Sequence, residues 1–165
     1  MANNDAEHTA TSGDNQAPTH NIRTPIVFRT GNILRSDADA ICIPVNCVGV
    51  AGAGLAKAWA NADPAAAHIY RSLCKGGAIT PGSVAWLNGT PWALCATKDN
   101  WRHSSKAVWV NGCLLRLRGS QAWGSLAVPY LGAGLGGLSE DAVRQAIEEA
   151  FAGDVRRVEV WSYGR

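Results

Sequence analysis

The sequence is short of charge, of long apolar runs and of membrane-targeting signals, and each shortage excludes a class of protein. Charged residues make up 17% of the 165 residues and the net charge is +2, well below the basic excess of dedicated nucleic-acid-binding domains. A nucleic-acid substrate is therefore neither required nor excluded. No apolar run approaches about 18 residues and no signal segment opens the chain, so we expect a soluble, cytoplasmic protein that does not bind membranes.

The five cysteines form no CxxC motif and no Cys/His pair, so we expect no metal site. We also expect no cofactor. The cysteines are odd in number, and all but Cys74 lie in apolar segments. Buried free thiols in a reducing compartment show this pattern. Cys47 and Cys95 are accordingly interpreted as small buried side chains and not as nucleophiles.

Residues 1–24 contain almost no large apolar side chain, and such a segment buries too little surface to offset the entropy of ordering. We predict a flexible tail at 1–24 and one folded domain at 25–165. Hydrophobic residues make up 47% of the chain, enough for a substantial core. No internal repeat or second domain is visible, and we expect a monomer.

Strand and helix patterns alternate along the chain, which predicts an α/β fold, a three-layer α/β/α domain with a mixed central sheet. Pro44 is unusual in a central strand because it has no N–H to donate. Ser104 and Ser105 are predicted to cap one helix, and Ser139 another. The predicted strands cover 24–30, 40–45, 83–87, 92–97, 126–130 and 155–163, and the predicted helices cover 55–74 (broken at Asp63-Pro64), 104–119 and 139–152.

Two glycine-rich loops each join an apolar strand to a helix. The first glycine loop covers residues 49–54 and the second covers residues 132–137. Glycine lets the backbone bring N–H groups close to a ligand, and a helix N-terminus behind the loop favours an anion. One such loop is often a plain turn, but two in one domain favour a diphosphate ligand.

The second loop also satisfies the dinucleotide-binding pattern G-x-G-x-x-G through Gly132, Gly134 and Gly137. That pattern belongs to the first βαβ unit of a Rossmann domain. Only 28 residues follow Gly137, enough for one helix and one strand. We therefore do not expect an NAD-dependent oxidoreductase.

Five motifs occur in order along the chain. They are GNIL at 31–34, DAI at 39–41, VNCVGVAGAGLA at 45–56, TKDNWR at 97–102 and PYLGAGLGGL at 129–138. Together they resemble the macrodomain family, the ADP-ribose-binding α/β/α module, over roughly residues 26–163. The last two motifs look most like those of the DarG-type antitoxin macrodomains and of the terminal ADP-ribose glycohydrolases.

The resemblance implies that ADP-ribose lies between the two loops. In the first loop Gly49, Val50, Gly52, Ala53, Gly54 and Leu55 are expected around the diphosphate and the distal ribose, with Asn46 near the hydroxyls of that sugar. From the second loop Leu131, Gly132, Ala133, Gly134, Leu135, Gly136 and Gly137 are expected to close over the diphosphate. Asn32, Ile33 and Tyr163 are expected beside the adenine.

Two positions depart from related patterns. Many macrodomains carry Asp where this chain has Asn32, and an amide accepts a hydrogen bond less strongly than a carboxylate. We therefore expect weaker adenine recognition, or recognition by backbone groups. The eukaryotic glycohydrolase relatives carry a catalytic Asp where this chain has Gly136. DarG-type domains also lack that Asp.

The resemblance assigns the chemistry to Lys98. The matching lysine is proposed to act at the anomeric carbon of the distal ribose, which requires a neutral amine and a lowered pKa. The alternative role for Lys98 is that of a cation that holds the leaving group or a phosphate. Trp101 and Arg102 either stack on a nucleobase and hold its phosphate, or pack onto the loop. His103 is interpreted as a neighbour of the helix cap.

The first functional hypothesis is an ADP-ribosyl hydrolase that removes mono-ADP-ribose from DNA, through a thymidine linkage, or from acidic side chains of a protein. Its partners would be ADP-ribose and ADP-ribosylated DNA or protein. The alternative is a non-catalytic reader of ADP-ribose, which needs the loops but not Lys98. The sequence has no counterpart of the long C-terminal extension of the antitoxins, so we do not expect a toxin-neutralising role.

Overall fold

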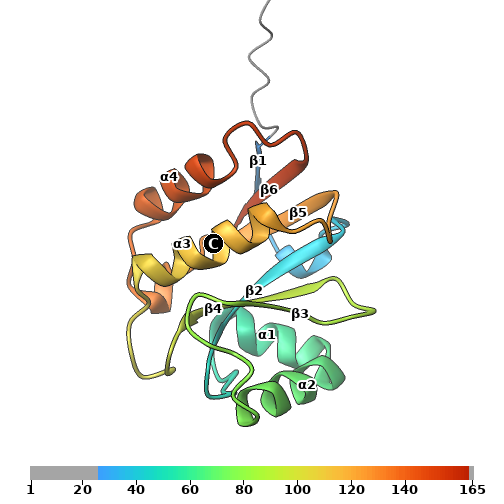
Figure 1. Ribbon diagram of the computed structural model, residues 1–165, viewed down its shortest axis with the longest axis vertical. Coiled ribbons are helices and arrows are strands. Elements are labelled where there is room, and N and C mark those ends of the chain that lie inside the picture. The colour runs from blue at the N-terminus through green and yellow to red at the C-terminus, as the bar shows by residue number, and fades with distance from the viewer. Residues whose placement is uncertain (1–25, 164–165) are drawn as a thin grey trace, which may run out of the picture.

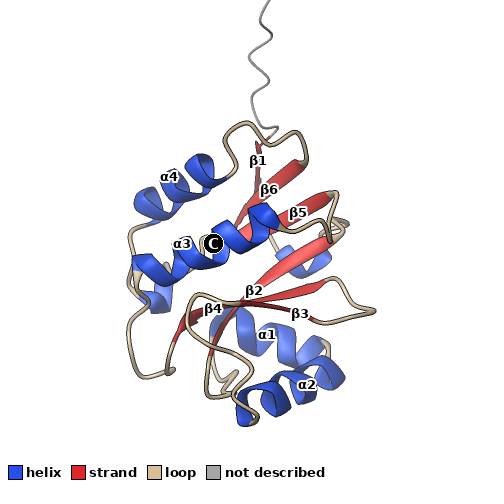
Figure 2. Ribbon diagram, in the orientation of Figure 1, coloured by secondary structure: helices blue, strands red, loops and turns tan. Residues whose placement is uncertain are grey.

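A six-stranded sheet lies between two layers of helices in the computed structural model, which describes residues 26–163 (Figures 1 and 2). The predicted tail at 1–24 lies outside the described residues. The strands are β1 (Ile26–Thr30), β2 (Ala40–Asn46), β3 (Val84–Trp86), β4 (Trp92–Lys98), β5 (Ser125–Pro129) and β6 (Arg157–Ser162). The helices are α1 (Gly54–Ala62), α2 (Pro64–Lys75), α3 (Ala107–Gly119) and α4 (Glu140–Ala150), with 3₁₀ turns η1 (Ile33–Arg35) and η2 (Gly134–Gly136).

The strand order is β1-β6-β5-β2-β4-β3. All neighbouring pairs are parallel except β3 and β4, which form an antiparallel hairpin. The predictions of a mixed sheet and of this hairpin are confirmed. Gly89, in the turn between the two strands, has a φ of 77°, which explains the Asn88-Gly89 pair there.

The strands β2 and β5 part toward their carboxyl ends. They are paired only at Ala40 with Leu126 and at Ile41 with Ala127, whereas β2 stays paired with β4 as far as Asn46. Pro44 and Pro129 lie in the parted segments, where the missing N–H of proline removes no bond between β2 and β5. In open α/β sheets, ligands bind in a crevice outside the carboxyl ends of the strands, which is where this gap lies.

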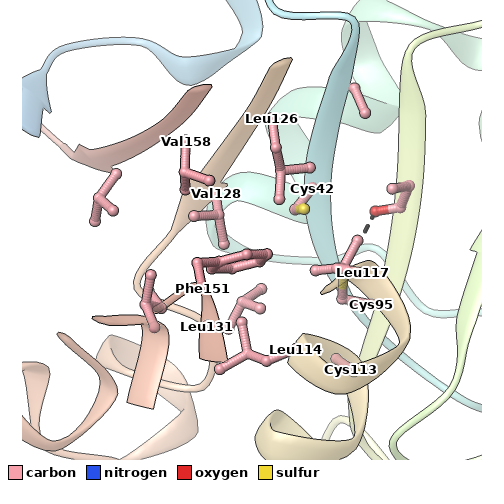
Figure 3. Packing of buried hydrophobic residues seen from close by; sticks show 14 of the residues in the cluster. Cys42, Cys95, Cys113, Leu114, Leu117, Leu126, Val128, Leu131, Phe151 and Val158 are labelled. Carbon is pink, nitrogen blue, oxygen red and sulfur yellow. Dashed lines mark hydrogen bonds between the residues drawn. The ribbon is translucent and has the colours of Figure 1, made fainter. Parts of the chain in front are cut away.

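The apolar side chains of β2 alternate between two cores. Cys42 packs with α3, α4 and their loops on one face of the sheet, and Ile43 packs with α1 and α2 on the other. Figure 3 shows Phe151 in the first core among Val128, Leu131 and Leu114. The prediction of free thiols is confirmed for all five cysteines, but the prediction that Cys47 is buried is wrong, because this residue is only partly buried where the chain leaves β2. Within residues 26–163 no helix is both long enough and apolar enough to cross a membrane.

Side-chain caps explain the starts of α2 and α4, whereas α1 and α3 begin without one. Asp63 caps α2 by accepting a bond from the backbone N–H of Ala66 at 3.0 Å, and Ser139 caps α4 by accepting one from Ala142 at 3.3 Å. The prediction that Ser104 and Ser105 cap α3 is wrong, because the N-cap is Lys106, which forms no side-chain cap. Ser105 is instead held under the second glycine loop.

Candidate functional site

A cleft of about 970 Å³ opens where β2 and β5 part. This volume is typical of small-molecule and cofactor sites. Four predicted site residues, Gly49, Leu131, Gly137 and Arg102, do not line the cleft, and their roles in binding stay predictions. The remaining ones do line it: Asn32, Ile33, Asn46, Val50, Gly52, Ala53, Gly54, Leu55, Lys98, Trp101, Gly132, Ala133, Gly134, Leu135, Gly136 and Tyr163.

The first glycine loop is held by the side chain of Asn46 at the end of β2. Its Oδ1 accepts bonds from the backbone N–H groups of Val48 and Val50 at 3.1 and 3.3 Å, and its Nδ2 donates to the Val50 carbonyl at 2.7 Å. These bonds fix the course of the chain between the strand and α1. Asn46 therefore shapes the loop, and its contact with a sugar stays a prediction.

Tyr70 of α2 supports Asn46 from the core. Its hydroxyl lies 2.8 Å from the carbonyl oxygen of Asn46 and 2.9 Å from Oδ1, and donates toward both. The side chain is completely buried, and burial raises the pKa of Tyr70 well above its usual range. The hydroxyl therefore stays protonated as a donor. Sequence reasoning missed Tyr70, because a tyrosine in an alanine-rich helix carries no signal of a distant loop.

The second glycine loop is seated on Ser105 and Val110. A Cβ on Gly132 would lie 2.8 Å from Cδ1 of Leu138 and 2.9 Å from Cγ2 of Val110, and a Cβ on Gly136 would lie 2.5 Å from Oγ of Ser105. These positions have no space for a side chain. The backbone N–H of Ser105 donates to the Gly136 carbonyl at 3.0 Å. Among the described residues, the buried Oγ of Ser105 has no hydrogen-bond partner.

Lys98, the last residue of β4, joins the two loops. Its ammonium Nζ donates to the carbonyl of Leu135 in the second loop at 3.1 Å. On the other side, Sγ of Cys47 donates to the Lys98 carbonyl at 3.3 Å, at the start of the segment that leads into the first loop. The side chain of Leu135 reaches toward the first loop, where its Cδ1 is 3.6 Å from a Cβ position on Gly54. The amine of Lys98 therefore lies where the two loops approach each other.

Trp101 and Arg102 follow Lys98 at the mouth of the cleft. The guanidinium carbon of Arg102 lies 4.7 Å from the centre of the Trp101 ring, so the cation packs on the indole. Trp101 is still 49% exposed and lines the cleft, so its ring remains able to stack on a base. His103 contacts both carboxylate oxygens of Asp99 through Nδ1 at 3.1 Å. This contact makes it a partner of Asp99.

At the end of the cleft assigned to adenine, Oδ1 of Asn32 accepts a bond from the N–H of Leu34 at 3.1 Å and caps η1. How adenine is recognised at this end stays a prediction. Tyr163 lines the same end and is 86% exposed. Among cleft residues that sequence reasoning missed are Pro44, Thr97, Ser105, Pro129, Tyr130 and Trp161.

The polar lining of the cleft limits its chemistry. Lys98 is its one cation and Glu140 its one carboxylate among the described residues. Residues 26–163 contain no cluster of three His, Cys, Asp or Glu that would hold a metal ion. The arrangement therefore offers backbone groups and one amine to an anionic ligand, and the absence of a metal stays a prediction.

A scan against models of protein families found no match for this chain. The DNA ADP-ribosyl glycohydrolase of Mycobacterium tuberculosis is 34% identical over 135 residues, which are 76% of this chain and 38% of that protein. The DNA ADP-ribosyl glycohydrolase of Thermus aquaticus is 34% identical over 151 residues, covering 82% of this chain and 40% of that protein. The chain thus spans about two fifths of the length of these curated relatives.

Solved structures agree with the sequence comparison. The macrodomain of Mycobacterium tuberculosis DarG superposes on this chain with a TM-score of 0.77 and 31% identity. The match covers 86% of this chain and 99% of that structure. Both the fold and the sequence similarity therefore extend over nearly the whole of the described domain.

Proposed function

The chain belongs to the macrodomain family, in the group of the DarG macrodomains, and on this premise we propose that it is an ADP-ribosyl glycohydrolase that releases mono-ADP-ribose from DNA. One observation carries the proposal. The Nζ of Lys98 lies 3.1 Å from the Leu135 carbonyl, where the two glycine loops meet at the cleft. An ADP-ribose bound between the loops presents its distal ribose to this amine.

The reaction requires the bond between the anomeric carbon of the ribose and the base to break, while a water molecule supplies a hydroxyl to that carbon and a proton to the base. The two roles of Lys98 differ in the charge state of its amine. As a neutral amine it attacks the anomeric carbon and water later releases it; as a cation it stabilises charge on the leaving group or on a phosphate. The backbone of both loops holds the diphosphate in either case.

The distribution of charge favours DNA over an acidic protein as the carrier of ADP-ribose. Between positions 47 and 119 there are eight Lys and Arg against two Asp, a net charge of +6. The remaining positions carry seven basic residues against eleven acidic ones, a net charge of −4. The basic segment contains Lys98 and Trp101, which line the cleft, and Arg102, which packs on Trp101. Phosphates of a DNA strand are attracted to such a region. Both relatives compared above are named for DNA ADP-ribosyl glycohydrolase activity.

The second candidate function is a reader that binds ADP-ribose without turnover. The hydrogen bond from Lys98 to Leu135 favours it, because an amine that only ties the second loop to β4 would serve binding alone. In that case removal of the amine would weaken the affinity for ADP-ribose, and neither the wild type nor the variant would release ADP-ribose from a substrate.

The test compares the wild type, Lys98→Ala and Lys98→Arg with thymidine-linked ADP-ribosylated single-stranded DNA and with glutamate-linked ADP-ribosylated protein. Free ADP-ribose is measured over time. We expect release from DNA by the wild type, and a loss of about 100-fold or more in Lys98→Ala, the size typical of removing a covalent or acid–base group. Lys98→Arg separates the two roles, because only a cationic role tolerates arginine.

A matched control is Lys75→Ala, which removes an exposed lysine at the end of α2, outside the cleft. It should retain wild-type release. Wild-type turnover by Lys98→Ala would remove the lysine from the mechanism. Tight ADP-ribose binding with no release from either substrate would establish the reader instead.

A further inference from the structure

The segment that leads from the cleft into α3 carries two pairs of a tryptophan and a cation. Arg102 packs on Trp101 at 4.7 Å, and Nζ of Lys106 lies 4.7 Å from the centre of the Trp109 ring. We call these four residues the tryptophan–cation strip. Aromatic rings interleaved with basic side chains are the composition by which proteins bind single-stranded nucleic acid.

The strip begins inside the candidate site and leads away from it. Trp101 lines the cleft beside Lys98, whereas Lys106 and Trp109 lie outside the lining. Lys106 is the N-cap of α3, so the second pair occupies the first turn of that helix. Arg102 and Lys106 are exposed, and Trp109 is half-buried. A DNA strand attached to the distal ribose would therefore leave the cleft next to the strip.

The cations of the strip are free to meet phosphates. Among the described residues, neither Arg102 nor Lys106 forms an ion pair, whereas Arg118 is bound to the buried carboxylate of Asp154 at 2.6 Å. The one carboxylate between positions 99 and 109 is Asp99, and both of its oxygens face His103. The strip thus combines positive charge with little competition from acidic groups.

We propose that the tryptophan–cation strip binds the single-stranded nucleotides next to the modified base. This inference rests on the proposed function, because it concerns the same site and extends its substrate beyond one nucleotide. Bases stack on the exposed indole surfaces and on the guanidinium plane of Arg102, and backbone phosphates contact Arg102 and Lys106. The surface then selects a strand of DNA over an isolated ADP-ribosylated nucleotide.

The first experiment needs no catalysis. A fluorescein-labelled, unmodified single strand of DNA is titrated with the wild type and with Lys106→Glu, and binding is measured by fluorescence anisotropy. The strand has about 20 nucleotides, which exceeds typical site sizes of about 4–16 nucleotides. We expect the variant to bind roughly 10-fold more weakly, with a salt dependence reduced by about one phosphate contact. Lys106→Arg should keep wild-type affinity.

The matched control is Arg116→Glu. It makes the same change of charge on the same helix, about 15 Å further along at 1.5 Å per residue, and Arg116 is also exposed. If Arg116→Glu weakens binding as much as Lys106→Glu, net charge and not the strip accounts for the affinity. Equal binding by the wild type and Lys106→Glu would overturn the proposal outright.

The second experiment separates the strip from the proposed function. For a modified strand of this length, Lys106→Glu should raise KM about 10-fold and leave kcat unchanged. For a modified mononucleotide, and for binding of free ADP-ribose, it should match the wild type. A wild type that binds the unmodified strand but releases no ADP-ribose would contradict the glycohydrolase and retain the strip. Release from modified protein alone, without binding of the strand, would overturn the strip as a nucleic-acid surface.

Discussion

The two glycine loops lie on opposite walls of one cleft, yet they are supported in opposite ways. The first is held by side chains, through the amide of Asn46 and the hydroxyl of Tyr70 beneath it. The second is held by the absence of side chains, since Gly132 and Gly136 lie against Ser105 and Val110 with no room for a Cβ. Similar sequence patterns therefore have different physical requirements. In the first loop side chains beside the glycines fix the backbone, although Gly49 and Gly54 also have a positive φ. In the second loop the packing leaves no space for a side chain at Gly132 or Gly136.

The difference between the two loops is tested most directly by adding one methyl group to each. Gly132→Ala should destabilise the protein by about 3 kcal/mol, from overpacking and from a side chain at a positive φ. The φ of Gly132 is 78° and its Cβ would meet three side chains within 3.1 Å. Thermal unfolding should show a melting temperature lower by about 10 °C.

The paired variant is Gly52→Ala in the first loop. A Cβ there would meet Cγ1 of Val50 at 3.6 Å, an ordinary contact. Its melting temperature should stay near that of the wild type. Equal losses in both variants would mean that the loops do not differ in the way described.

A smaller effect is expected from loosening the support of the first loop. Tyr70→Phe removes the hydroxyl that donates to Asn46 and should cost about 1–2 kcal/mol, because Asn46 loses a buried partner. ADP-ribose affinity, measured by calorimetry, should fall several-fold as the loop becomes less ordered. Tyr163→Phe, at an 86% exposed residue, should leave the melting temperature unchanged. Unchanged stability and affinity in Tyr70→Phe would show that Asn46 holds the loop alone.

The smallest effect concerns the thiol at the start of the first loop. Burial, with smaller contributions from Cys74 and Asp99, raises the pKa of Cys47 to about 11. A raised pKa keeps the thiol protonated, so only about a thousandth is thiolate at pH 8. Alkylation of Cys47 by iodoacetamide, followed by mass spectrometry, should be slow at pH 8 and should accelerate toward pH 11.

The same labelling reports on the loop. In Tyr70→Phe we expect faster alkylation of Cys47 at pH 8, because a less ordered loop admits water to the thiol. Urea-unfolded protein provides the unprotected rate. Rapid alkylation of the folded wild type at pH 8 would contradict the raised pKa of the partly buried Cys47 thiol.

Local signals predicted much of the fold. The Asp63-Pro64 pair marked the boundary between α1 and α2, where Asp63 caps the second helix and Pro64 begins it. Asn88-Gly89 predicted the hairpin of β3 and β4. These features depend on residues within a few positions of one another, so the sequence contains their whole cause. The parallel order of the strands depends on distant contacts and was predicted only as a class.

The candidate site shows the same difference between features that depend on neighbouring residues and features that depend on distant contacts. Lys98 and both loops were recognisable as continuous motifs, and the cleft brings them together. Tyr70 acts on Asn46 from 24 positions away, and nothing local marks it. Ser105 was misinterpreted as a helix cap because the cap pattern is local, whereas its partner Gly136 belongs to a loop 31 positions later. Residues whose function depends on a distant backbone are those that sequence reasoning misses.

The two prolines at the parted strands have a consequence for the shape of the sheet. Neighbouring strands tend to stay paired along their length, because an unpaired backbone N–H needs an acceptor. At Pro44 and Pro129 the chain has no N–H to offer, so closing the gap between β2 and β5 would gain fewer hydrogen bonds. The separation of β2 and β5 is therefore fixed by the sequence of the two strands themselves, so that a substitution of either proline by a residue with an N–H would favour closer pairing of the strands.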